Sequence, residues 1–233
     1  MTTLDQIQKE IFDKRFDWDA IDKKKALKHP EILVVLREAG LIESYLPVYT
    51  GKMLELFWYD LSATTIFTIE GFEAYTHYYI IRRYLDLVGY NPINDEEVIN
   101  LRKKERKTVY KDEIRELVNF MATEHFAAQF FTDLIDITEE PILKTMLPRF
   151  AKEETSHSQF AYDLLEARLE KNPKLKKTIE EHAKSVKHIG AYVVPRVSPA
   201  KDDNIKTLLG FNRKVESLVG QPLSDLLVKN KKI

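Results

Sequence analysis

The segment EETSHSQF, residues 153–160, places a carboxylate and an imidazole three positions apart. On a helix Glu154 and His157 share one face, because residues three or four apart lie one above the other. The same face carries Phe150 and Ala161, which predicts that it is an apolar stripe facing the core. An isolated carboxylate is costly to bury and normally takes up a proton instead. A metal cation bound by both side chains would offset this cost.

Three other segments carry acids on an apolar stripe in the same way. Apolar residues recur at helical spacing over residues 30–60, 62–88, 108–136 and 138–170, which predicts four long helices. Their stripes contain, in chain order, Glu43, then Glu70, Glu73 and His77, then Glu124, and finally Glu154 with His157. The interval between Glu43 and Glu73 equals the interval between Glu124 and Glu154. The pattern therefore indicates two similar helix pairs.

Two such pairs would bring carboxylates and two imidazoles together at the centre of a four-helix bundle. This is the arrangement of di-iron and di-manganese carboxylate proteins. The chain has no Cys, so only oxygen and nitrogen donors are available. Mixed carboxylate and imidazole donors suit iron or manganese. We therefore expect two Fe ions, with Mn or a mixed Mn/Fe pair as alternatives.

The composition fits a helical protein with one domain. The 233 residues include seven Gly and nine Pro, too few for many tight hairpins. We expect one all-α, ferritin-like domain over residues 1–233, with the metal-binding bundle at about 30–170. Helices within residues 1–28 and the segment 190–233 would be peripheral additions.

Charge and hydropathy exclude some partners. The formal net charge of −1 argues against a protein that binds nucleic acid through its overall charge. The longest aliphatic run covers only residues 32–36, and the N-terminus lacks an apolar signal core, so we expect a cytoplasmic protein without a membrane partner. The basic run LRKKERKTVYK, residues 101–111, reads as a solvated helix end and loop or as a docking patch for an acidic partner.

Several motifs resemble the soluble acyl-carrier-protein desaturase family, which has a ferritin-like fold and a di-iron centre. The matching segments are VVLREAGLIESYLPVY from Val34, EHFAAQFF from Glu124, EEPIL from Glu139 and KEETSH from Lys152. His77 and the following RRYLDLVG lie where the family has its other His motif. The resemblance covers about residues 30–190. It implies that Glu73 and Glu154 bridge two irons, that Glu43, Glu124, His77 and His157 bind terminally, and that Glu153 orients a ligand His.

The sequence departs from the family pattern before His77. The motif there is FEAYTH, so Ala74 stands where the family has a ligand acid. Glu73 could bind at i, i+4 from His77, Glu70 could bind at the Glu-x6-His spacing of other helical di-iron oxygenases, or this site could lack a carboxylate. The repeated interval favours Glu73. A second departure is Ala127, where plant-type members carry a Thr.

The resemblance predicts an oxygen-dependent di-iron oxidase that introduces a double bond into a fatty acyl chain on a carrier protein. It implies a ferredoxin-type electron donor and a homodimer. The two departures leave open a di-metal oxygenase of another apolar small molecule, for example one that oxygenates an amine nitrogen. A third alternative is a ferritin-like protein that binds metal or oxidises ferrous iron.

Overall fold

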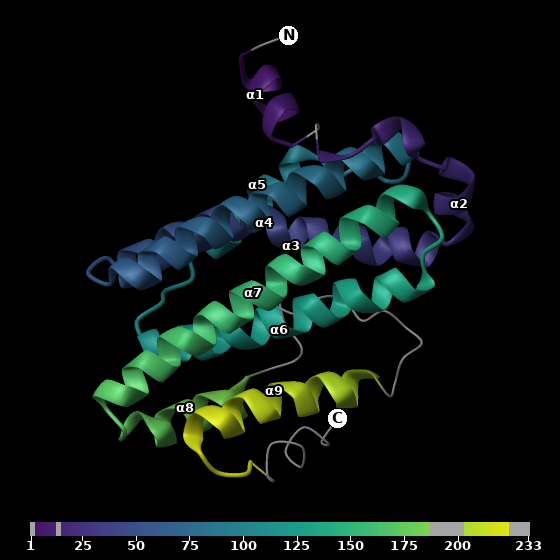
Figure 1. Cartoon of the computed structure of the whole chain (residues 1–233). Helices are drawn as coiled ribbons and strands as arrows, with labels where there is room; N and C mark the ends of the chain where they lie inside the picture. The colour runs from purple at the N-terminus through teal and green to yellow at the C-terminus, as the bar shows by residue number, and fades with distance from the viewer. Residues whose placement is uncertain (1–2, 13–14, 187–202, 224–233) are drawn as a thin grey trace.

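The computed structural model describes residues 3–12, 15–186 and 203–223, and every regular element within them is a helix (Figure 1). The expected all-α class is therefore confirmed for this part of the chain. Residues 190–202 and 224–233 of the expected peripheral segment lie outside the described residues.

Four long helices dominate the molecule: α3 (Pro30–Leu56), α4 (Leu61–Val88), α6 (Glu113–Ile137) and α7 (Pro141–Lys171). Short turns join α3 to α4 and α6 to α7, and the helices of each pair pack along their length (Figure 1). Contacts between α4 and α7 join the two pairs. The four long helices expected from apolar periodicity are thus present, and α3 continues through Pro47.

Shorter helices surround the long ones. They are α1 (Thr3–Ile11), the 3-10 turn η2 (Trp18–Ala20), α2 (Lys23–Lys28), α5 (Asp95–Glu105), α8 (Leu175–Ser185) and α9 (Asp203–Val219). Helix α9 packs against α6, α7 and α8.

Polar caps set the limits of the long helices. The side chain of Asp60 accepts a hydrogen bond from the backbone N–H of Ala63 at the start of α4, and Gly89 ends that helix with a φ of 81°. At α7 the cap is Glu140, which accepts from Leu143, whereas the apolar spacing predicts a helix from residue 138. Glu140 lies one residue before Pro141, where the first free N–H groups need acceptors.

The apolar core is divided into two clusters. One contains the N-terminal part of α3, the C-terminal parts of α4 and α6, and the N-terminal part of α7. The other contains the opposite ends of the same four helices together with residues of α8 and α9. On every long helix the Glu and His residues of the predicted centre lie between the two clusters. A polar layer therefore crosses the middle of an otherwise apolar interior.

Two glycines of α3 give a matched test of this packing. A Cβ at Gly40 would lie 2.8 Å from Ile81 Cγ2 and 2.9 Å from Ile93 Cδ1, whereas a Cβ at Gly51 would meet nothing within 4 Å. Gly51→Ala should therefore stabilise the protein by about 0.5–1 kcal/mol through helix propensity. Gly40→Ala should destabilise it, because overpacking costs roughly 1–3 kcal/mol. Urea unfolding of both variants checks this, and equal shifts in the same direction would contradict the close α3–α4 approach.

Candidate metal centre

The polar layer is built from one or two buried side chains on each long helix. Glu43 comes from α3, Glu70 and His77 from α4, Glu124 from α6, and Glu154 with His157 from α7. Each is at most 7% exposed. Helical periodicity explains the placement, because each residue continues the buried stripe that fills the two apolar clusters. Six of the seven predicted site residues therefore lie together inside the core.

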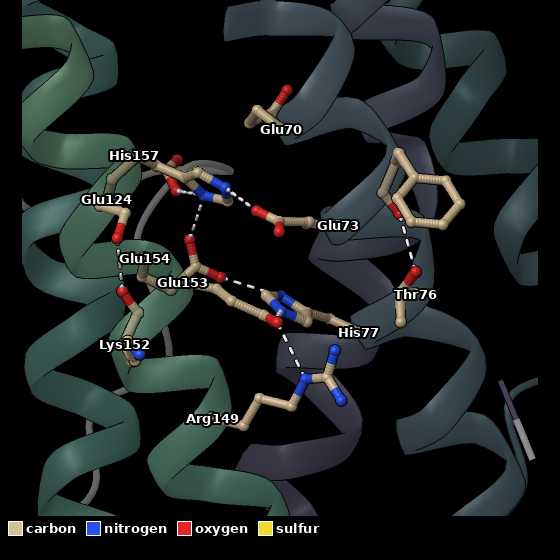
Figure 2. Close-up of polar contacts among 12 residues, drawn as sticks. Glu70, Glu73, Thr76, His77, Glu124, Arg149, Lys152, Glu153, Glu154 and His157 are labelled. Carbon is tan, nitrogen blue, oxygen red and sulfur yellow. Dashed lines mark hydrogen bonds and ion pairs between the residues drawn. The ribbon is translucent and has the colours of Figure 1, made fainter. Parts of the chain in front are cut away.

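Glu154 lies at the centre of this layer (Figure 2). Its Oε1 atom is 2.9 Å from Nδ1 of His77, and its Oε2 atom is 3.0 Å from Nδ1 of His157. Two groups of possible metal ligands result, Glu43–His77–Glu154 and Glu124–Glu154–His157, with the ligand atoms of each group within 4.8 Å of one another. Glu154 belongs to both groups, so one carboxylate could bridge two ions.

The remaining acids complete the two groups. Glu124 Oε2 lies 3.3 Å from Nδ1 of His157, and Glu43 Oε1 lies 4.0 Å from Nδ1 of His77. Among the described residues, Glu43 Oε2 has no hydrogen-bond partner although it is buried. His77 Nδ1 also lacks a hydrogen bond, since its close approach to Glu154 does not have hydrogen-bond geometry. Buried polar atoms are rarely left in this state, and a cation would satisfy both.

Each imidazole is held from its other side by a second carboxylate. Nε2 of His77 lies 2.7 Å from Glu153 Oε2, and Arg149 Nε donates to Glu153 Oε1 at 2.9 Å. Nε2 of His157 lies 2.7 Å from Glu73 Oε2. Such contacts fix the ring orientation and keep the proton on Nε2, which leaves Nδ1 free for a metal. The expected orienting contact of Glu153 is confirmed, whereas Arg149 was not anticipated.

The positions of Glu70 and Glu73 differ from the sequence interpretation. Glu73 was favoured as a bridging ligand, but its side chain is 28% exposed and contacts the outer nitrogen of His157. Glu70 is 1% exposed, accepts a hydrogen bond from Thr50 Oγ1 at 3.2 Å, and lies on the His157 side of the layer (Figure 2). Glu70 lies seven residues before His77, which places the two side chains about 20° apart around the helix axis. Glu73 lies four residues before His77, which places them about 40° apart, so Glu70 follows the His77 face more closely. The geometry favours Glu70 as the acid of α4.

His125 has a separate role although it neighbours Glu124. Its Nε2 atom lies 2.9 Å from the carbonyl oxygen of Thr207, at the contact between α6 and α9. Adjacent helical residues point about 100° apart, so only one of the two can face the layer. The side chain that faces it is Glu124.

Burial acts upward on the pKa of each acid in the layer, whereas the effect of neighbouring groups differs from one acid to another. Burial raises the pKa of Glu43 and Glu124 well above the usual range, reinforced in both cases by the charge of Glu154. Burial also raises the pKa of Glu70 to about 7. For Glu154 burial acts upward too, but close contacts with Glu124, His157 and His77 outweigh it and bring the pKa well below its usual range. Without a metal, the layer therefore holds protons on some of its acids.

The imidazoles respond to the same acids. Burial lowers the pKa of His77, but contacts with Glu153 and Glu154 outweigh it and raise that pKa to about 10. The pKa of His157 is also raised, because Glu124, Glu154 and Glu73 together overcome its burial. Two protonated imidazoles neutralise only part of the charge of four buried carboxylates. Two divalent cations would balance all four carboxylates with both imidazoles neutral, so the residues present fit a di-metal centre.

Comparisons of this chain with known protein families, curated proteins and solved structures find no match. None of the described helices combines the length and the apolar character needed to cross a bilayer.

Removal of the shared carboxylate tests the centre directly. Glu154→Gln should reduce bound Fe²⁺ or Mn²⁺ from about two ions per chain to less than one, because both groups lose a ligand. Metal analysis after dialysis measures this, with circular dichroism as a check on folding. The matched control is Glu166→Gln, an exposed acid of the same helix, which should bind as the wild type does. Equal metal content in the two variants would contradict a shared ligand.

The number of metal ions bound by two variants distinguishes the roles of Glu70 and Glu73. Glu70→Gln should lose one of the two ions, since it removes a buried acid from the layer. Glu73→Gln should keep both ions but bind them about 10–100-fold more weakly, as expected for a residue that supports a ligand His. Titration with Mn²⁺ followed by electron paramagnetic resonance distinguishes the two. The reverse result would return Glu73 to the ligand set.

Proposed function

We propose that this protein is a di-iron oxidase that uses molecular oxygen. The observation that carries the proposal is the position of Glu154, whose two oxygen atoms each approach Nδ1 of a different buried His. A bridging carboxylate between two Glu/His groups is the central element of di-metal carboxylate proteins. Mn or a mixed Mn/Fe pair would fit the same donors.

We assign α3, α4, α6 and α7 to a ferritin-like four-helix bundle with flanking helices. Support comes from the placement of acids, because each of the four helices contributes a buried carboxylate to one layer. The His residues come from α4 and α7, one from each helix pair.

Two ferrous ions bound in the layer would supply the electrons that reduce oxygen and would give an oxidant able to remove hydrogen from an unactivated C–H bond. The chain's own residues hold the geometry for this chemistry. Glu153 and Arg149 fix the ring of His77, while Glu73 fixes the ring of His157. Phe150 packs 4.1 Å from His77 between ring centroids, and Phe120 stacks on His157 at 6.5 Å. These rings exclude water from the layer, which protects a reactive oxidant from side reactions.

For the substrate, we propose a fatty acyl chain on a carrier protein. This part rests on the resemblance of residues 124–170 to the acyl-carrier-protein desaturases. A ferredoxin-type electron donor, a homodimer and a cytoplasmic location belong to the same proposal.

A second candidate is a di-metal oxygenase that acts on another small molecule. Two observations favour it: Glu70 is buried seven residues before His77, and the buried Ala127 stands where the desaturases use a Thr. Oxygenation of an amine nitrogen is one such reaction.

Product analysis decides between the candidates. The iron-loaded, chemically reduced protein should consume oxygen and form an olefin when given an acyl-carrier substrate, and Glu154→Gln should abolish both while Glu166→Gln does not. Oxygen consumption with an N-oxygenated product from an aryl or alkyl amine, and no olefin, would select the second candidate. Rapid oxidation of Fe²⁺ that is unaffected by either substrate would instead indicate ferroxidase activity and overturn both.

A further inference from the structure

Three strongly exposed apolar side chains gather at one end of the molecule. Trp58, in the turn between α3 and α4, is 75% exposed, and Leu61, the first residue of α4, is 82% exposed. Val109, in the connection between α5 and α6, is 72% exposed. Exposed apolar residues are common one by one, but three side chains of this size with so little cover are not explained by packing. We refer to Trp58, Leu61 and Val109 as the apolar tip.

Polar contacts hold these two connections at the same end of the helices. Lys52 of α3 donates to the carbonyl oxygen of Thr108, next to Val109, and Tyr59 contacts Glu113 at the start of α6. Arg168, near the end of α7, donates to Asp60 at 2.8 Å. The α3–α4 turn, the start of α6 and the α7–α8 turn therefore meet at one end, on the left in Figure 1.

Exposed basic residues are frequent in the segments that meet at this end. Those in residues 101–113 and 170–177 are Lys103, Lys104, Arg106, Lys107, Lys111, Lys171, Lys174, Lys176 and Lys177. Within these segments and residues 51–61, the carboxylates of Glu55, Glu170 and Asp112 are exposed and that of Glu113 is partly exposed, so basic side chains outnumber acidic ones. The whole chain has a formal net charge of −1, so the rest of the chain is acidic. The charge distribution would orient this end toward a negatively charged surface.

We propose that this end docks on the surface of an anionic lipid bilayer, with the apolar tip in the headgroup region. Trp is enriched at membrane interfaces because its ring is amphipathic, and Lys or Arg residues near the surface are attracted by anionic lipids. The tip side chains are exposed at helix connections and at the start of α4, which suits insertion between headgroups. An acidic protein that docks through charge alone would account for the basic residues but not for the apolar groups that protrude beside them.

The sequence predicts no membrane partner, because it contains no long apolar run, but the tip forms only when the fold brings Val109 to the same end as Trp58 and Leu61. Docking of this kind needs no spanning helix. The proposal does not depend on the metal centre, so it can be tested with metal-free and metal-loaded protein alike.

Vesicle binding tests the proposal on the full chain. Co-sedimentation should show binding to vesicles of phosphatidylcholine and phosphatidylserine in equal amounts, much weaker binding to phosphatidylcholine alone, and weakening as salt is added. The chain has two Trp residues. In a Trp18→Phe background, the emission of Trp58 should therefore shift to the blue on binding, because the ring leaves water.

Matched variants distinguish vesicle binding through the apolar tip from nonspecific adsorption. The double variant Trp58→Ser and Leu61→Ser should bind at least tenfold more weakly, whereas Ile137→Ser, an exposed apolar residue at the opposite end of α6, should bind as the wild type does. Lys103→Gln with Lys104→Gln should lose about fivefold for each charge removed. All replaced side chains are exposed, and circular dichroism checks that each variant folds.

Two outcomes would overturn the proposal. One is equal affinity of the wild type and the tip variant for anionic vesicles. The other is no vesicle binding at low salt together with salt-sensitive retention on immobilised polyglutamate that does not require Trp58. The second result would assign the basic residues to an acidic protein partner.

Discussion

The structure depends on the burial of four carboxylates in one layer of an apolar interior. Glu43, Glu70, Glu124 and Glu154 converge between two apolar clusters, where ionised groups lose most of their hydration. Protons can reduce the charge, as the raised pKa values of Glu43 and Glu124 indicate. Divalent cations would do the same with all four acids ionised, and would in addition use the donor atoms of Glu43 and His77 that lack hydrogen bonds.

The two imidazoles link this layer to the outside of the helices. Each has one ring nitrogen toward Glu154 and the other toward a less buried acid, Glu153 for His77 and Glu73 for His157. Because an imidazole is rigid, fixing one nitrogen also fixes the direction of the other. The outer acids thereby position the inner donor atoms, and the arrangement is similar in the two helix pairs.

Charge is separated between the interior and one end of the molecule. Acids gather at mid-height of the long helices, whereas exposed Lys and Arg residues gather where the α3–α4 turn meets the start of α6. The two regions use charge differently. In the interior, low polarity makes each charge strongly dependent on its partners, while at the surface many solvated charges act together over longer distances.

Helical periodicity alone determined much of the centre. Glu154, His157, Glu124 and Glu43 continue apolar stripes, so the sequence places them inward, and the class of donor follows from the residue types. The all-α class and the four long helices follow from the same spacing. The sequence could not decide between Glu70 and Glu73, because positions four and seven residues before His77 lie on nearly the same side of a helix. Only the neighbours from other helices, Thr50 for Glu70 and His157 for Glu73, decide which acid enters the layer. The apolar tip likewise needed the tertiary structure, since Trp58 and Val109 lie far apart in the chain and are brought to one end by contacts such as Lys52 with Thr108. Local spacing sets the face on which a side chain lies, whereas long-range packing sets what that face meets.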